Sequence, residues 1–296
     1  MLSTTFLCAA ASACTRGGLN LIDRHLYGVE RRSVRATMVV NLLLPLSACL
    51  ALAVIVRPPP RLAAAFFSSA TLIPALMIQM VSYAYASAFK RRPLASVILD
   101  SKLGELLIPL ALAPWAHAFR TRDVLFYGLS FLAFTPMFRR RPATGSLTPR
   151  GHALPVIGAT VAQAVVFFWF PTHEGASSPG DLLVFHTGVL AWRFVFSVAV
   201  LLAQPRDRGP RAPRPGLADA PMLVMRGGLF LATQITFFLT LSQPEAHLAW
   251  PILNSAALLS TLAAGPILKE KARAEEIVPI VLLGALAIAR VVFGGA

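Results

Sequence analysis

The stretch LASVILDSKLGELLIPL, residues 94–110, combines the composition of a lipid-facing helix with three charges. Leucine and isoleucine dominate it, which is typical of a membrane-spanning segment. Asp100, Lys102 and Glu105 lie inside it, and each charge costs free energy at such a depth. A span with this sequence must therefore turn its charges away from lipid, towards protein or water.

The composition of the whole chain indicates a membrane protein. Of its 296 residues, 56% are hydrophobic and only 14% are charged, with a mean hydropathy of +0.67, whereas soluble domains carry about a quarter charged residues. A spanning helix needs about 20 residues, so the apolar runs predict an all-α, polytopic bundle of about ten transmembrane helices. These runs lie at about residues 2–22, 37–56, 63–88, 94–117, 123–138, 152–171, 182–203, 220–241, 246–267 and 276–294.

The basic residues predict the orientation of the chain. The formal net charge is +14, but the Lys and Arg residues form short clusters between apolar runs. Nucleic-acid-binding proteins carry theirs on a solvated face, so we expect the lipid bilayer as a partner and no nucleic acid. Eighteen Lys and Arg follow the odd-numbered runs and only four lie in the other connections. The positive-inside rule then places the odd-numbered loops in the cytoplasm and both termini outside, or the N-terminus inside if residues 2–22 do not span. We expect a multi-pass protein of the bacterial inner (plasma) membrane.

The second half of the sequence resembles the first half. LASVILDS (94–101) aligns with LAWPILNS (248–255) at a shift of 154, which sets Asp100 opposite Asn254, and Gln79 matches Gln234 at a shift of 155. A unit of five spans that is copied once must be inserted the other way up, because five is odd. We therefore predict a first five-helix repeat, a linker and a second five-helix repeat, at residues 1–142, 143–151 and 152–296. Inverted repeats of this kind are typical of secondary transporters, which hold their substrate near the membrane midplane.

The charges of the opening stretch gather on one side of a helical wheel. At about 100° per residue, the leucines fall in one arc, while Ser101, Gly104 and Glu105 fall on the opposite side. Lys102 and Glu105 are three residues apart and can pair. Three interpretations stay open. The charges line a water-filled cavity and bind substrate or a proton, they fix one helix against another, or Asp100 lies near enough to the membrane surface to be hydrated.

Further polar residues lie inside the apolar runs. Arg193 is placed at mid-span, where it needs a partner, and Asp100 or Glu105 is the obvious carboxylate. His186 lies two turns earlier on the same face and either titrates near neutral pH or sits at a membrane surface. The remaining candidates either bind substrate or serve helix packing and the aromatic belt: Gln79, Gln234, Asn254 and Trp250.

The C-terminal stretch WPILNSAALLSTLAAGPILKEKARAEEIVPIVLLGALAIARVV, residues 250–292, resembles the drug/metabolite transporter superfamily in its ten-helix EamA-like branch. Glu270 matches the family's turn glutamate and Gly284 its helix glycine, while Arg24 matches the basic residue that often closes the first helix. The turn is longer than usual, and the first half's counterpart, residues 118–131, has no such glutamate. The resemblance implies alternating-access movement of a small polar or amphipathic metabolite, often amino-acid-like, and it names no substrate.

The sequence shows no catalytic signature. It has no nucleophile elbow, phosphate-binding glycine loop or metal-spaced His or Cys cluster, so we expect neither an enzyme nor a cofactor or metal. The first hypothesis is a secondary transporter of a small-molecule substrate, with proton coupling an option for the same charges. The second is an intramembrane enzyme or scaffold that acts on a lipid-linked substrate. A transporter predicts matched polar positions in both halves, whereas an enzyme predicts chemistry concentrated in one.

Overall fold

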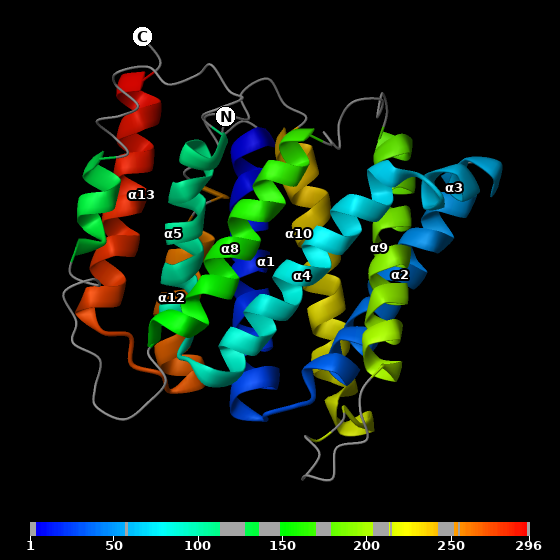
Figure 1. The fold of residues 1–296 in the computed structure, drawn as a ribbon, viewed down its shortest axis with the longest axis horizontal. Coiled ribbons are helices and arrows are strands. Elements are labelled where there is room, and N and C mark those ends of the chain that lie inside the picture. Colours follow the sequence, from blue (N-terminus) through cyan, green and yellow to red (C-terminus); the bar gives the residue numbers. More distant parts are fainter. Residues whose placement is uncertain are drawn as a thin grey trace.

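The computed structural model describes residues 4–56, 59–112, 128–135, 149–169, 179–203, 213, 215–241, 252–253 and 255–294. All regular structure within these ranges is helical, as the sequence predicted. The long helices lie side by side, and the start of α1 and the end of α13 are at the same end of the bundle (Figure 1).

Each apolar run of the sequence contains a described helix. The first half contains α1 (Thr4–Arg24), the π-helical turn η1 (His25–Val29), α2 (Val34–Val56), α3 (Pro59–Phe66), α4 (Ser69–Arg91) and α5 (Leu94–Leu112). Residues 128–133 are also helical. The second half contains α8 (Pro149–Trp169), α9 (Pro179–Leu202), the 3₁₀ turn η2 (Leu217–Asp219), α10 (Ala220–Leu241), α12 (Ala256–Leu268) and α13 (Ala274–Gly294).

The third apolar run, expected as one helix over 63–88, is broken between α3 and α4. Ser68 is the N-cap of α4, and its Oγ accepts a hydrogen bond from the backbone N–H of Ala70 at 3.1 Å. On the other side of the break, the indole N–H of Trp192 donates to the carbonyl oxygen of Phe66 at 2.5 Å. A serine favours such a start because its side chain satisfies an N–H that the first helical turn leaves unpaired.

Three helices are long and apolar enough to cross a membrane, within the part of the chain that the structure describes. They are α2, α4 and residues Leu183–Leu202 of α9, with mean hydropathies of 2.6, 1.4 and 1.7. No more than 39% of any of these windows is buried inside the bundle, and apolar side chains such as Leu52 and Ile55, 51% and 80% exposed, point outward. Soluble monomers rarely expose apolar surface on this scale. These features are compatible with a membrane protein.

Helix α1 occupies the middle of the bundle. It packs against α10, α12, α4 and α5, while α5 packs against α8, α12 and α13, and α9 against α2, α3 and α4. Gly104 allows α5 to approach α8 closely, because a Cβ at that position would lie 3.0 Å from Cβ of Thr160 and 3.3 Å from Cα of Ile157. This close packing fixes the position of α5 relative to α8.

Candidate functional site

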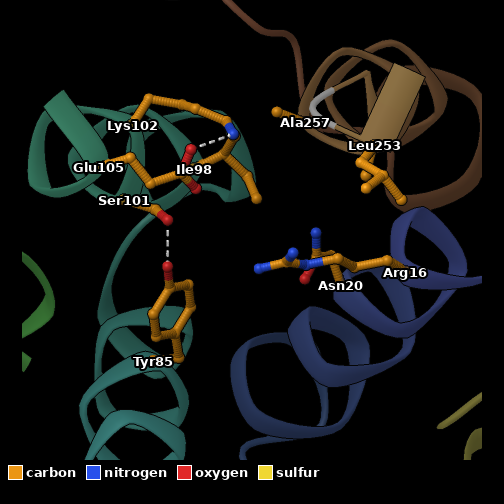
Figure 2. Close-up of a pocket in the computed structure, with 10 residues that line it drawn as sticks. Arg16, Asn20, Tyr85, Ile98, Ser101, Lys102, Glu105, Leu253 and Ala257 are labelled. Atoms are coloured by element: carbon orange, nitrogen blue, oxygen red, sulfur yellow. Dashed lines mark hydrogen bonds and ion pairs between the residues drawn. The ribbon is translucent and has the colours of Figure 1, made fainter. Parts of the chain in front are cut away.

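A pocket lies where α1, α4, α5 and the start of α12 meet (Figure 2). The volume that the centre of a water molecule can reach inside it is about 30 Å³. Since one water needs about 10–15 Å³ by this measure, the pocket holds two or three waters or one small polar group in this conformation. It is lined by Arg16, Asn20, Tyr85, Ile98, Ser101, Lys102, Glu105, Leu253, Ala256 and Ala257.

The polar face of α5 provides one wall of the pocket. The Lys102 ammonium donates to the Glu105 carboxylate at 2.6 Å, which confirms the pair expected from their spacing. The side chain of Glu105 is 32% exposed, so water and small solutes can reach its carboxylate. From α4, the Tyr85 hydroxyl donates to the Ser101 hydroxyl, and this bond fixes α4 against the same face (Figure 2).

Arg16 faces this wall from α1. Its side chain extends past Asn20, one turn further along the same helix, towards the Tyr85–Ser101 pair (Figure 2). Within the part of the chain that the structure describes, the Arg16 guanidinium takes part in no ion pair and no hydrogen bond. Arg16 was not among the site residues predicted from the sequence, although a cation inside the first apolar run was the signal that could have found it.

Asp100 does not share this pocket with Lys102 and Glu105. Its side chain is fully buried and forms an ion pair with Arg92, which directly follows α4. The interpretation that the charges of this helix line a cavity is therefore wrong for Asp100. The physical reason is the helical period, because Asp100 lies at the opposite edge of the polar arc from Lys102 and turns towards the end of the bundle.

Arg193 belongs to a second polar cluster between α4 and α9. Its Nε donates to Gln79 Oε1 at 3.2 Å, a terminal nitrogen donates to Ser82 Oγ at 2.9 Å, and the guanidinium lies 5.8 Å from the centre of the Phe230 ring. The Gln79 amide in turn donates to Ser197 Oγ at 2.8 Å. Gln79 therefore has a structural partner in the cluster and lies outside the pocket lining.

The expected salt bridge between Arg193 and Asp100 or Glu105 is thus not formed. Helix α9 packs against α2, α3 and α4, so its charge meets the amide and hydroxyls of α4 and not the carboxylates of α5. Uncharged acceptors and an aromatic face satisfy the guanidinium instead.

The remaining predicted site residues lie away from the pocket or outside the described ranges. His186 is half-buried on α9, where its ring lies 5.6 Å from that of Phe185. Gln234 is half-buried on α10. Trp250 and Asn254 lie outside the residues that the structure describes. Of the predicted site residues that the structure describes, only Lys102 and Glu105 line the pocket together.

A second arrangement of charge joins the two halves at one end of the bundle. Arg24, at the end of α1, forms an ion pair with Glu270 at 2.5 Å and also donates to the Phe89 carbonyl at the end of α4. The other carboxylate oxygen of Glu270 accepts from the backbone N–H of Leu94, the first residue of α5, at 2.9 Å. We call these four residues the Arg24–Glu270 joint.

The joint depends on a glycine in the π-helical turn. A Cβ on Gly28 would lie 1.8 Å from a guanidinium nitrogen of Arg24 and 2.6 Å from the Phe89 carbonyl oxygen. Only glycine leaves room for the arginine to reach Glu270 by this path. Arg24 and Glu270 were both noted in the sequence for their resemblance to family positions, and the structure pairs them.

Another ion pair lies near the same end. Arg226 of α10 and Asp23 of α1 form two hydrogen bonds, at 2.6 and 3.0 Å.

Among the described residues, no group of three or more His, Cys, Asp or Glu could hold a metal ion.

Comparison with known proteins bears on the fold alone. No family model and no curated protein matches the chain. Eight chains of solved structures match, and one of them is a crystal structure described only as that of a protein. It aligns with 99% of this chain and 98% of its own, with a TM-score of 0.57 and 18% sequence identity. At this identity the likeness establishes only that the fold has been observed before.

Proposed function

We propose that this protein is a secondary transporter of the drug/metabolite transporter kind, located in the inner membrane of a bacterium. Ten helices would form two inverted five-helix repeats and move a small polar or amphipathic metabolite by alternating access. The observation that carries the proposal is the pairing of helix contacts between the two halves.

The contacts can be compared by setting α1, α2, α4 and α5 against α8, α9, α10 and α12, in chain order. The contact of α1 with α10 then corresponds to that of α8 with α4, and the contact of α5 with α8 to that of α12 with α1. Likewise, the contact of α4 with α9 corresponds to that of α10 with α2. The pairs α2–α9 and α5–α12 join corresponding helices directly. A pseudo-twofold axis between two copies of one unit requires such pairing, which therefore supports the inverted repeat.

The position of the pocket supports the proposal, because alternating access needs a substrate site between the two units. Its walls come from α1, α4 and α5 of the first unit and from the start of α12 of the second. The Arg24–Glu270 joint connects the same helices at the end where the charge distribution predicts the cytoplasm. A joint that breaks and re-forms would open and close the pocket at that end, as expected for rocking of one repeat against the other.

The test is solute flux in proteoliposomes that contain the purified protein. We expect saturable uptake of at least one solute from a panel of radiolabelled small metabolites. A pH gradient imposed on the same vesicles tests proton coupling. Glu105→Gln should abolish or uncouple this flux. As a control, Ser47→Ala should not, because Ser47 lies on an exposed face of α2 and bonds only to the carbonyl of Leu43 in its own helix. Absence of saturable flux across the panel would argue against the proposal.

One observation favours the intramembrane enzyme or scaffold. All charged groups of the described lining, on Arg16, Lys102 and Glu105, come from the first half, whereas the second contributes only Leu253, Ala256 and Ala257. Chemistry concentrated in one half is the pattern expected of an enzyme. Conversion of a component of a membrane-lipid extract by the purified protein, without solute flux, would establish this alternative.

A further inference from the structure

The polar groups that line the pocket are mostly hydrogen-bond donors. Arg16 presents a guanidinium, Asn20 an amide NH₂ and Lys102 an ammonium group. Ser101 accepts a hydrogen bond from α4 and keeps its own O–H as a donor. The acceptors among the described lining residues are the Asn20 amide oxygen and the Glu105 carboxylate, one oxygen of which already accepts from Lys102 at 2.6 Å. The lining therefore favours a ligand that supplies acceptors.

The charges of the described lining residues leave an excess of one positive charge. Arg16 and Lys102 each contribute +1 and Glu105 contributes −1. The negative charge of Glu105 is balanced by Lys102, so the excess resides on the Arg16 guanidinium. An isolated guanidinium within a helix bundle is costly unless water or a counter-charge reaches it, and Arg16 is exposed as well as part of the pocket lining.

We propose that the pocket binds a small organic monoanion, with its carboxylate held by Arg16. This inference rests on the proposed transporter function and names the substrate class of the same site. A guanidinium matches a carboxylate with two parallel hydrogen bonds, and the amide of Asn20 can supply a third donor. The apolar part of the ligand lies against Ile98, Leu253 and Ala257. The space of about 30 Å³ accepts the carboxylate, and the apolar part requires the pocket to widen as access changes.

Other charge types fit the pocket less well. A cation would meet an excess of positive charge. An amino-acid zwitterion would bring its ammonium group to Glu105, whose charge Lys102 already balances. A dianion would exceed the available positive charge by one.

The experiment compares binding and transport of matched solutes that differ only in the head group. The set is butyrate, butyramide, butylamine and 2-aminobutyrate. Binding is measured as the shift in melting temperature of the detergent-purified protein, and transport as uptake into proteoliposomes. The variants are Arg16→Gln, Arg16→Lys and the control Arg273→Gln, which removes an exposed arginine from the α12–α13 loop, outside the pocket.

We expect butyrate to bind most tightly to the wild type and to Arg273→Gln. Arg16→Gln should weaken butyrate binding at least about tenfold, equivalent to about 1.4 kcal/mol, and Arg16→Lys should recover part of the loss. Preference for butylamine or 2-aminobutyrate, failure of all four to bind, or equal butyrate binding by Arg16→Gln would each overturn the inference. Saturable transport of a solute other than the anion would overturn it too, while supporting the transporter function. Arg16-dependent butyrate binding without uptake of any solute would retain the anion site and reject the transporter.

Discussion

The Arg24–Glu270 joint gives the sharpest prediction about movement. In Glu270→Gln the amide can still accept from the Leu94 N–H, but the ion pair with Arg24 at 2.5 Å is lost. Both side chains are largely shielded, at 14% and 17% exposure, so the pair is only weakly screened by solvent. A hydrogen bond to a charged group contributes about 1.5–3 kcal/mol. The substitution should therefore weaken the closed joint by that amount.

This loss should appear as a change in population. A weakening of about 1.5–3 kcal/mol changes an equilibrium by about tenfold to a hundredfold, so an open state at about one part in a hundred would rise to about one part in ten or beyond. The assay is a distance distribution between spin labels at Lys90→Cys and Lys271→Cys in a cysteine-free background. Both positions are exposed, and each directly follows a residue of the joint, Phe89 or Glu270.

We expect one short distance in the parent and an added longer distance in Glu270→Gln. Arg24→Gln should give the same added distance, and the double variant should add nothing more, because both changes remove one shared interaction. Arg273→Gln, which neutralises a charge in the same loop, should leave the distribution unchanged. Identical distributions in the parent and Glu270→Gln would show that the joint does not control access.

Three further predictions concern folding, each measured as the melting temperature of the purified protein. Gly28→Ala should destabilise the folded protein by about 1–3 kcal/mol, because the added Cβ would meet the joint. Gly158→Ala, whose Cβ would have nothing within 4 Å, should be neutral or stabilising, and equal effects of the two substitutions would refute this reasoning. Asp100→Asn should lower the melting temperature, because it leaves the shielded Arg92 without its charged partner. Glu105→Gln should leave the melting temperature near the wild-type value, since Glu105 is 32% exposed, and the reverse order would contradict the assignment of these two carboxylates. Arg193→Met should destabilise the folded protein by about 1–3 kcal/mol, because buried hydrogen-bonding groups on α4 lose their partner. An unchanged melting temperature would argue against the cluster.

The helices could be predicted from the sequence because their signal is local. An apolar run of about 20 residues indicates a helix whatever it packs against, and the described helices coincide with those runs. The break at Ser68 was missed because it depends partly on Trp192, which is far away in the chain and donates to the carbonyl of Phe66. The pairing within α5 was predicted for the same local reason, since Lys102 and Glu105 are neighbours on one helix.

The partners of the other charges could not be predicted, because they depend on which helices become neighbours. Arg193 was expected to meet a carboxylate, but α9 packs against α4 and brings Gln79 to it. Arg92 was counted as one of the basic loop residues at the membrane surface, yet it is the partner of Asp100. Arg16 was not predicted as a site residue, and only the packing of α1 against α5 reveals that it lines the pocket.

The central claim is that one pocket opens alternately to the two sides of the membrane. The most direct test places a single cysteine at Ser101, a pocket residue of nearly the same size, in a protein without Cys8, Cys14 and Cys49. A membrane-impermeant thiol reagent is then applied to right-side-out and to inside-out vesicles. We predict modification from both sides, with Glu270→Gln raising the rate from the cytoplasmic side and lowering it from the other. Modification from one side alone, at rates that Glu270→Gln does not change, would contradict alternating access.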